Sequence, residues 1–435
     1  MIFRQFVDED LGCGSYLVGD SGVAVLVDPS FRIEQYLVAA DELGVTIERV
    51  LETHTHADHV SGHGRLAGEH GLPVAIHSLA DAEFPHEALQ DGDVVRVGAI
   101  EIRVLHTPGH RPEHCAFVVD GKIVLTGDSL FVGDAARPDL AVAARKGAED
   151  LFQSLRKLEA LGDEVEVYPG HVAGSLCGGN MSSDRSTTIG RERASNEALS
   201  LREMQEFVMA SASLTTPRPP TTERVVALNR GPWVGLPTLP SQLDDGDGAT
   251  VLDVRPFADH AAGHVHGAIN VPVSGSSFGT KAGFVLLPDE PVVVHARTAE
   301  EAAAAAWKLW AVGLLEIAGY VLDTPAPEQL ATVDVAELKR LLDEDEVQLV
   351  DVREAGERDD AYIPGSRNVP YRLLRKLRGD GLEPDKTVVT ICESGARAGI
   401  AASLLQREGF DVRAVSPGGI PDFTGEIVSF RRCGS

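Results

Sequence analysis

The first 171 residues contain seven histidine and aspartate side chains in four short motifs that could bind a metal ion. The motifs are THTHADH at 53–59, TPGH at 107–110, TGD at 126–128 and YPGH at 168–171, and the seven residues are His54, His56, Asp58, His59, His110, Asp128 and His171. Several motifs are short turns after apolar strand-like runs, and turns at strand ends can converge into one pocket. Imidazole and carboxylate are ordinary ligands of zinc and iron. One such histidine alone would be an ordinary solvated residue, but the combined pattern predicts a metal centre.

A second chemical signature is a cysteine loop in the last quarter of the sequence. Cys392 follows the apolar run 387–391, and a short turn leads into the Ala-rich stretch 396–407, which is predicted to be a helix. A cysteine placed there lies among converging backbone N–H groups at the positive end of a helix dipole, where a nucleophilic sulfur or a bound anion is stabilised. Arg397 adds positive charge for thiosulfate or sulfite. We therefore predict that Cys392 and Arg397 are catalytic, although an isolated cysteine after a strand is normally a core residue.

The region that contains this loop is the second of two copies of one domain. LDVR at 252–255 is followed by GAINVP at 267–272, and VDVR at 350–353 is followed by GSRNVP at 365–370. Self-similarity over about 100 residues indicates a duplicated domain, because the repeats of solenoid proteins are only ~20–50 residues long. Aligning the two copies puts Ala296 opposite Cys392 and Glu301 opposite Arg397. Since it has no thiol, the first copy is predicted to be catalytically inactive.

The elements that must position these residues alternate between strand and helix patterns. In the first part, β-branched runs at 23–27, 74–76, 100–105, 116–119 and 123–125 alternate with helical patterns at 32–43, 61–70, 147–161 and 192–210. The Ser-, Thr- and Pro-rich segment 211–224 is predicted to be an extended linker. We predict a metal-binding domain at 1–210, the linker at 211–224, a domain without catalytic cysteine at 225–322 and an active domain at 330–435, with parallel sheets in the last two.

Composition restricts the partners and the compartment. The 435 residues carry a net charge of -27, which argues against nucleic acid and anionic membrane surfaces as partners. We find no signal peptide and no apolar run long enough to span a bilayer. The five cysteines, Cys13, Cys115, Cys177, Cys392 and Cys433, are scattered and form no CxxC pair, which fits a reducing compartment. We expect a cytoplasmic protein in which Cys13, Cys115 and Cys177 are small buried core residues and Cys433 is incidental.

The metal motifs resemble those of the metallo-β-lactamase superfamily, whose fold is an αββα sandwich, over about the first 200 residues. Within that superfamily, THTHADHVSG, HTPGH, LTGDSLFVGDAARPDL and the segment 186–193 resemble the persulfide dioxygenases. The resemblance implies one Fe(II) per chain held by His54, His110 and Asp128, a set of two imidazoles and one carboxylate typical of non-haem iron oxygenases. The remaining residues, His56, Asp58, His59 and His171, would then orient ligands or water, or would hold a second metal.

The duplicated region resembles rhodanese domains, because the DVR and Asn-Val-Pro elements precede a C-x-x-x-x-R loop. The fold class is therefore expected to be mixed α/β and α+β: a metallo-β-lactamase sandwich followed by two α/β rhodanese-like domains. Known fusions of a persulfide dioxygenase with rhodanese domains imply two linked reactions. A small-thiol persulfide, O₂ and water would give thiol and sulfite, and a Cys392 persulfide would interconvert sulfite and thiosulfate. Such a fused acidic enzyme is expected to be a homodimer or homotetramer.

Two matters stay open at the level of the sequence. The same seven metal-binding residues could hold two zinc ions and hydrolyse a thioester, as in glyoxalase II, or the chain could be a non-catalytic sulfur carrier or sensor. Arg137 and Asp139 match a G-x-x-x-R-x-D element of the dioxygenases. Either they bind a carboxylate of the substrate, or they form an ion pair that only holds a loop.

Overall fold

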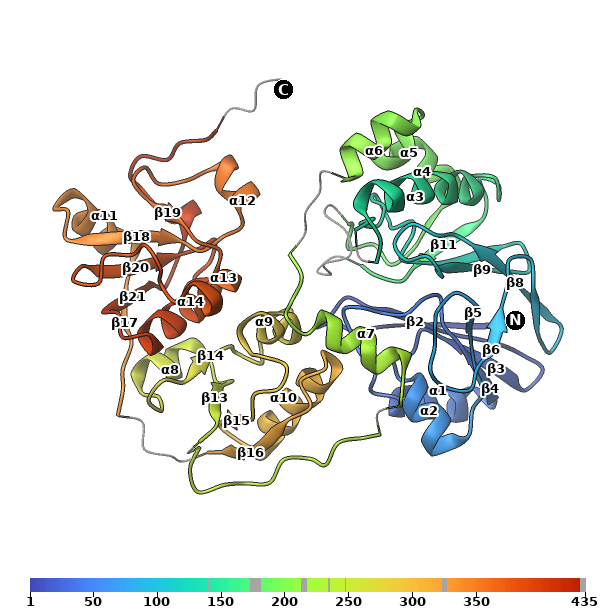
Figure 1. Ribbon diagram of the computed structural model, residues 1–435, viewed down its shortest axis with the longest axis horizontal. Coiled ribbons are helices and arrows are strands. Elements are labelled where there is room, and N and C mark those ends of the chain that lie inside the picture. Colours follow the sequence, from blue (N-terminus) through green and yellow to red (C-terminus); the bar gives the residue numbers. More distant parts are fainter. Residues whose placement is uncertain are drawn as a thin grey trace. The chain divides into compact units, whose positions relative to one another are not determined.

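A computed structural model describes residues 1–139, 141–172, 181–212, 217–233, 235–246, 248–322 and 327–430 of the chain (Figure 1). It divides into two compact units, one made of Met1–Pro237 with Trp310–Gly313 and the other of Thr238–Leu309 with Leu314–Ser435. The predictions for Cys177 and Cys433 fall outside the described residues. No helix in the described ranges has both the length and the apolar character needed to cross a membrane.

The first unit contains two six-stranded sheets that pack face to face. The first sheet has the order β1 (Ile2–Val7), β2 (Gly14–Asp20), β3 (Val23–Val27), β4 (Thr46–Leu51), β5 (Val74–His77) and β6 (Glu87–Leu89). The second has the order β12 (Thr187–Thr188), β11 (Glu166–Pro169), β10 (Ile123–Gly127), β9 (Cys115–Val119), β8 (Ile100–His106) and β7 (Val94–Val97). Alternate residues of these strands, such as Val25, Leu51, Phe117 and Leu125, form the core between the sheets.

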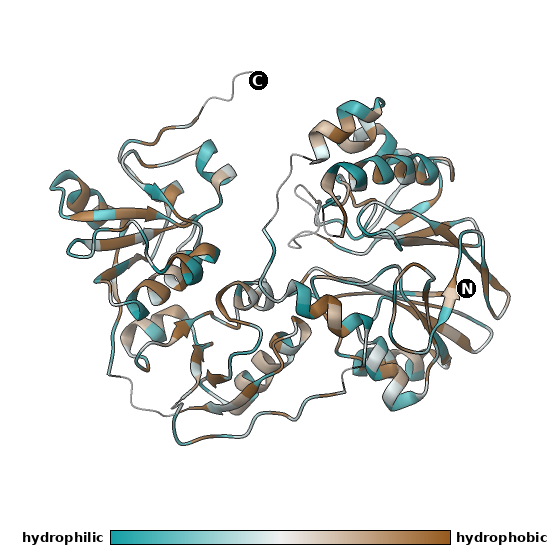
Figure 2. Ribbon diagram, viewed as in Figure 1, coloured by the Kyte–Doolittle hydropathy of each residue, from teal (hydrophilic) through white to brown (hydrophobic). Residues whose placement is uncertain are grey.

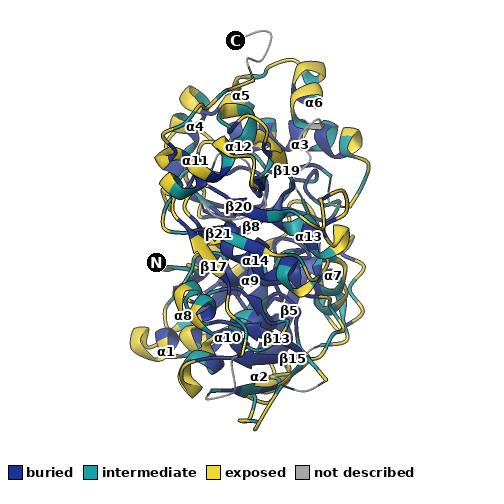
Figure 3. Cartoon of the chain, turned by 90° about the vertical axis from the view of Figure 1, so that its left-hand side faces the viewer, coloured by how far each residue is buried: buried dark blue, intermediate teal, exposed yellow. Residues whose placement is uncertain are grey.

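Helices cover the outer face of each sheet. Their apolar sides pack on the strands, as Leu66 does on the first sheet and Leu155 on the second, while their outer sides are hydrophilic and exposed (Figures 2 and 3). The helices are α1 (Glu34–Leu43), α2 (His63–His70), α3 (Ala144–Glu159), α4 (Ile189–Ser195), α5 (Glu197–Ser200) and α6 (Met204–Ala212). This αββα order confirms the fold class expected from the sequence. The single helix expected at 192–210 is instead three short ones, because Thr188 and Asn196 each cap a new helix start.

The second unit contains two parallel sheets. The four-stranded sheet has the order β14 (Ile269–Asn270), β13 (Thr250–Asp253), β15 (Val292–His295) and β16 (Ile317–Val321). The five-stranded sheet has the order β17 (Ala331–Val333), β21 (Val412–Val415), β20 (Thr387–Ile391), β18 (Val347–Asp351) and β19 (Arg367–Asn368). The helices around the first are α8 (Phe257–Ala262), α9 (Phe278–Val285) and α10 (Ala299–Ala311). Those of the second are α11 (Val335–Asp343), α12 (Ala355–Asp360), α13 (Tyr371–Leu377) and α14 (Ala396–Arg407).

Helix α7 (Thr222–Arg230) begins inside the segment that the sequence predicts to be an extended linker. It packs on the first unit because Asn229 is buried and pairs with the loop after β4. The Asn229 amide nitrogen donates to the carbonyls of His56 and His59 at 2.9 and 2.8 Å, and its oxygen accepts the Ser61 N–H at 2.8 Å. The first unit therefore extends beyond residue 210, and α7 fixes the backbone of the longest metal motif.

Replacing Asn229 by Leu tests this role of α7. The change keeps the shape of the side chain but leaves three buried backbone groups unpaired, at a cost of about 1–3 kcal/mol for each such group. We expect the free energy of unfolding of the first unit to fall by about 3 kcal/mol or more in a urea titration. The exposed Glu223→Gln change on the same helix serves as control and should stay within about 0.5 kcal/mol of the unmodified chain. Equal stability of the two variants would contradict the assigned role.

Candidate metal centre and cysteine loop

His54, His110 and Asp128 converge in the first unit from three different strand ends. They lie after β4, β8 and β10 respectively, and each is at most 1% exposed. The Asp128 Oδ2 atom lies 3.4 Å from His110 Nε2 and 3.9 Å from His54 Nε2. The three ligand atoms all lie within 4.8 Å of one another, close enough to share one metal ion. The structure thus brings together the three residues predicted to hold iron.

The electronic state of these three side chains fits a divalent cation. Burial and the neighbouring His56 lower the pKa of His54, and burial also lowers the pKa of His110, so both imidazoles are neutral. Burial by itself would raise the pKa of Asp128, but the charge and hydrogen bond of His171 lower it well below the usual range. His54 Nε2 and Asp128 Oδ2 are buried with no hydrogen-bond partner among the described residues. Buried polar atoms of this kind require a partner, and a metal ion supplies one.

The Nδ1 atoms of His54 and His110 are each held by a hydrogen bond. His54 Nδ1 lies 2.9 Å from Thr53 Oγ1, which donates to Asp28 at 2.8 Å. His110 Nδ1 donates to the carbonyl of Arg137 at 3.2 Å. Partners of this kind fix the orientation of an imidazole ligand and raise its basicity.

His114 fixes the backbone of Asp128 by a hydrogen bond. The sequence motifs did not reveal this role. His114 Nε2 accepts the Asp128 N–H at 2.9 Å, and its Nδ1 donates to the Thr107 carbonyl at 3.0 Å. Burial lowers the pKa of His114 to about 3, so the imidazole is neutral and Nε2 remains an acceptor. Gly127 has a φ of 48°, and a Cβ there would lie 2.7 Å from both His114 Nε2 and Thr53 Oγ1. Only glycine therefore fits between the two motifs.

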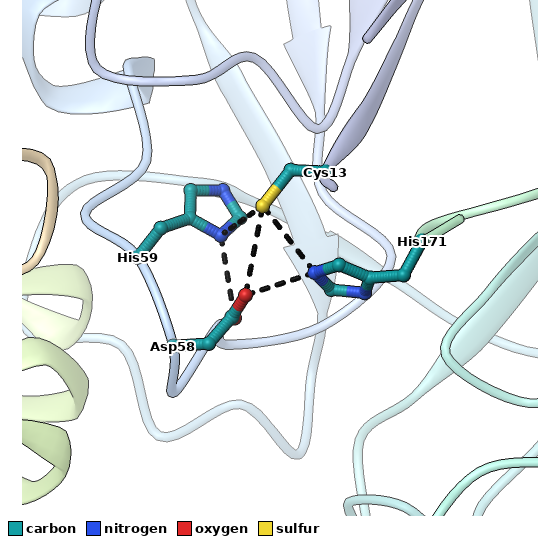
Figure 4. Close-up of side chains that lie close together, drawn as sticks. All are labelled: Cys13, Asp58, His59 and His171. Atoms are coloured by element: carbon teal, nitrogen blue, oxygen red, sulfur yellow. Dashed lines mark hydrogen bonds and ion pairs between the residues drawn. The ribbon is translucent and has the colours of Figure 1, made fainter. Parts of the chain in front are cut away.

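Asp58, His59 and His171 form a second buried cluster, and Cys13 is its fourth member (Figure 4). Cys13 Sγ lies 3.3 Å from His171 Nε2, 3.4 Å from His59 Nδ1 and 3.5 Å from Asp58 Oδ2. His171 connects the two clusters, because its Nδ1 lies 2.7 Å from Asp128 Oδ1. Cys13 is buried as predicted, but the expectation of an apolar core position is wrong, because its sulfur faces two imidazoles and a carboxylate. The sequence missed it because Cys13 is far from the metal motifs along the chain.

The Nε2 atom of His56 contacts two buried carboxylates. It lies 3.1 Å from Glu52 and 3.4 Å from Asp28. Burial opposes protonation, but the hydrogen bonds that His56 donates to Asp28 and Glu52 raise the pKa of His56 well above its usual value. On Glu52, the hydrogen bonds of His56 and His63 outweigh burial and lower its pKa to about 2. These side chains form a buried charged network that anchors the loop after β4.

Arg137 and Asp139 form a bidentate ion pair with each other. Arg137 Nε and Nη2 donate to the two Asp139 oxygens at 2.7 and 2.8 Å, and Arg137 is 5% exposed. Because Arg218 also contacts Asp139, the carboxylate is surrounded by guanidinium groups. The pair stabilises the loop whose Arg137 carbonyl orients His110, which agrees with the loop-holding alternative.

The cysteine loop in the second unit has the predicted geometry. Cys392 follows β20 directly, is 1% exposed, and accepts the Gly395 N–H at 3.1 Å through its sulfur. Gly395 precedes α14 and has a φ of 89°, which favours glycine at this turn. The sulfur therefore lies in a tight turn at the N-terminus of a twelve-residue helix.

Arg397 is not available as a free positive charge, because it pairs with Glu357 of α12. Its Nη1 and Nη2 atoms donate to the two Glu357 oxygens at 2.6 Å each. Burial alone would lower the pKa of Arg397, but the hydrogen bonds and charge of Glu357 raise it. The carboxylate neutralises the guanidinium that the sequence assigns to anion binding. An anionic sulfur compound must therefore compete with Glu357 for Arg397.

The middle domain has the same strand–turn–helix arrangement without the sulfur. Ala296 follows β15 as Cys392 follows β20, and it is buried. Glu301 pairs with Arg297 at 2.8 Å instead of providing positive charge. The aligned positions thus carry no nucleophile, as the sequence predicts.

The middle domain packs on the helix that follows Cys392. The Asn270 N–H donates to Ser403 Oγ of α14 at 3.0 Å, and a Cβ at Gly399 would lie 2.6 Å from the Phe257 ring. Arg375 of α13 pairs with Glu290 at 2.6 Å, with both side chains largely buried. The middle domain therefore packs against α14 and α13 of the last domain.

Comparison with known proteins agrees with this architecture. The Metallo-beta-lactamase superfamily matches residues 9–171, and the Rhodanese-like domain matches residues 237–323 and 334–426. Persulfide dioxygenase ETHE1 of Bos taurus is 30% identical over 247 residues, which are 55% of this chain and 91% of that protein. Hydroxyacylglutathione hydrolase of Cereibacter sphaeroides is 39% identical over 138 residues, 31% of this chain and 52% of that protein.

A solved structure shows the same relationship in three dimensions. The Staphylococcus aureus metallo-beta-lactamase structure superimposes with a TM-score of 0.68 at 30% identity, and it covers 74% of this chain and 98% of its own. Its match extends well beyond the residues that align with the metallo-beta-lactamase family alone. The chain therefore belongs to the metallo-beta-lactamase superfamily, and it joins a domain of that family, similar to the persulfide dioxygenases, to two rhodanese-like domains.

Proposed function

We propose that the first domain is an iron-dependent persulfide dioxygenase and that the last domain is a sulfurtransferase acting on the same sulfur. The observation that carries the proposal is the convergence of His54, His110 and Asp128, in which His54 Nε2 and Asp128 Oδ2 have no hydrogen-bond partner in the described part of the chain. Bound Fe(II) supplies open coordination positions at which a persulfide sulfur and O₂ can meet. The reaction is R–S–SH + O₂ + H₂O giving R–SH, sulfite and two protons, in which the outer sulfur loses four electrons to O₂.

The chain's own residues act by binding and by orientation. His54 and His110 present neutral nitrogen lone pairs because Thr53 and the Arg137 carbonyl hold their other nitrogens. Asp128 stays ionised because His171 hydrogen-bonds its second oxygen. The burial of all three keeps bulk water away, which favours a positioned reaction between bound partners.

At the last domain, sulfur passes through Cys392. The Cys392 thiol first takes the outer sulfur of a second persulfide, Cys–SH + R–S–SH giving Cys–S–SH and R–SH. The Cys392 persulfide then reacts with sulfite, Cys–S–SH + SO₃²⁻ giving Cys–SH and S₂O₃²⁻, so the sulfur–sulfur bond at Cys392 breaks as a new one forms to sulfite. The reverse reaction would load Cys392 from thiosulfate. Gly395 stabilises the sulfur through its N–H, and opening of the Arg397–Glu357 pair exposes positive charge to the anion. The fusion of the two domains favours linked reactions, because a tether raises the effective concentration of one domain near the other to roughly mM.

A di-zinc hydrolase is the second candidate function for the first domain. It is favoured by the presence of Asp58, His59 and His171 as a second donor cluster and by the likeness to hydroxyacylglutathione hydrolases. Such an enzyme uses both metals and a water between them to cleave a thioester. Oxygen consumption with a persulfide and thioester cleavage are separate readouts, so one preparation distinguishes the two functions.

The Asp128→Ala change tests the role of the first metal cluster. Loss of the only anionic donor among the three residues should remove the iron and lower kcat/KM for sulfite formation from glutathione persulfide by roughly 10³-fold or more, since a metal supplies several kcal/mol of stabilisation. Iron is measured by mass spectrometry and sulfite by chromatography. The exposed Asp41→Ala change in α1 is the matched control. Full sulfite formation by Asp128→Ala would contradict the role assigned to this cluster.

The Cys392→Ser change separates the two reactions. A serine hydroxyl cannot carry a persulfide sulfur, so thiosulfate formation should be abolished while sulfite accumulates at the rate of the unmodified chain. Both products are quantified in one time course with glutathione persulfide. Continued thiosulfate formation would show that Cys392 is not the carrier, and a parallel loss of sulfite would show that the two sites are not independent.

A further inference from the structure

We propose that Arg111 binds a carboxylate on the thiol half of the substrate, and that the first domain therefore selects persulfides of carboxylate-bearing thiols. Arg111 directly follows His110 in the sequence, but neither the metal cluster nor the proposed oxidation gives it a role. The proposal rests on the proposed function for the identity of the bound molecule, and it deepens that function by naming the class of thiol.

The guanidinium of Arg111 is held by the protein at one atom only. Its Nε donates to Glu113 Oε1 at 2.6 Å, and neither Nη group has a hydrogen-bond partner in the described part of the chain. The side chain is 11% exposed, so most of it lies inside the protein. The Nη nitrogens nevertheless reach solvent, because they are absent from the fully covered polar atoms that lack a partner. A dissolved anion can therefore contact them.

This single hydrogen bond sets Arg111 apart from three other arginines with little exposure. Arg65, Arg137 and Arg353 are each at most 5% exposed, and each forms a bidentate pair with one carboxylate. Such pairing offsets the cost of taking a guanidinium out of water. At Arg111 the edge formed by the two Nη groups is left for a group from outside the chain.

Glu113 fixes the guanidinium beside the loops that carry the metal ligands. Its Oε1 atom accepts the Arg111 Nε–H and also the N–H of Thr55 at 3.2 Å. Thr55 follows His54 directly, and both Thr55 and Glu113 are at most 3% exposed. The Arg111 side chain is thus tied to the loop after β4 as well as to the loop after β8. A persulfide bound by its outer sulfur at the metal site therefore has a fixed cation beside it.

The chemistry of the free edge favours a carboxylate. The Nη groups of an arginine lie in one plane and can donate parallel hydrogen bonds to the two oxygens of a carboxylate. The chain as a whole carries a net charge of -27 and repels anions, so an anionic substrate needs positive charge close to the site. Glu113 already offsets part of the charge of Arg111, which suits a singly charged carboxylate better than a phosphate dianion.

The unmodified full chain loaded with iron gives the first test. Glutathione and its diethyl ester share the same thiol and the same peptide backbone, but the ester has no free carboxylate. We expect anaerobic calorimetric titration to give a Kd for glutathione that is roughly 10- to 100-fold lower than the Kd for the ester, as for a hydrogen bond to a charged group. Equal Kd values, or no binding of glutathione, would overturn the proposal without the use of any variant.

The Arg111→Gln change gives the second test. It should raise KM for glutathione persulfide by roughly 10- to 100-fold and leave kcat little changed, because it removes a contact made equally in the ground state and the transition state. The KM for the diethyl ester persulfide should not change. Arg111→Lys keeps the charge without the planar edge and should give an intermediate KM. Arg103→Gln removes an exposed arginine from β8 and is the matched control, with both KM values unchanged.

An equal rise of KM for the two persulfides in Arg111→Gln would show that the Arg111–Glu113 pair only supports the loop, which would overturn the proposal. Binding and oxidation are measured separately, so their failures are distinguishable. If the chain takes up no O₂ with either persulfide but binds glutathione more tightly than the ester in a manner that depends on Arg111, the dioxygenase assignment fails and the carboxylate site stands. If it oxidises both persulfides with the same kcat/KM, the carboxylate site fails and the dioxygenase assignment stands.

Discussion

The structure of the first domain depends on the buried nitrogen and oxygen atoms of His54, His110 and Asp128, whose lone pairs face one another. A buried carboxylate costs several kcal/mol unless it is paired, and buried nitrogen lone pairs also need partners. The chain accepts this cost at His54, His110 and Asp128 because the ends of β4, β8 and β10 lie side by side in a rigid double sheet. A cation at their centre turns a destabilising arrangement into a stabilising one, so metal binding and correct folding of these loops support each other.

Two neighbouring clusters of buried donor atoms share this need for a positive charge, but they differ in the number of donor atoms that the protein supplies. The set around Asp128 has three protein donors and suits an ion that must also bind reactants. The set around Cys13 has four donor atoms, which also lie within 4.8 Å of one another. His171 contacts both through its two ring nitrogens, so the geometry of one set is transmitted to the other. In the second unit the proposed reactive group is the Cys392 sulfur, and Glu357 neutralises the charge of Arg397.

Local patterns in the sequence predicted most of the fold and the three residues that converge in the first unit. The strand at 23–27 and the helix at 396–407 have the predicted bounds, because alternation and turn residues are local signals. The placement of Ala296 opposite Cys392 followed from the repeat. Cys13 and Asn229 were missed because each acts on a metal motif far away along the chain, with no short motif of its own.

The pairing of Arg397 with Glu357 was missed for the same reason, since α12 and the cysteine loop meet only in the folded domain. The helix α7 was hidden by the Pro- and Thr-rich composition just before it. Contacts between segments that are distant in the sequence determine which charged side chains are neutralised by an ion pair. Composition and motif spacing do not reveal such contacts. The sequence therefore identified the reactive groups more completely than the groups that orient or neutralise them.

The most direct test of the central claim is O₂ uptake by the full chain after anaerobic purification and metal quantitation, with glutathione persulfide as substrate. We expect one iron per chain at the His54, His110 and Asp128 site, and one O₂ consumed for each sulfite formed. A chain that carries zinc at that site, hydrolyses thioesters and consumes no O₂ with the persulfide, even after loading with Fe(II), would contradict it.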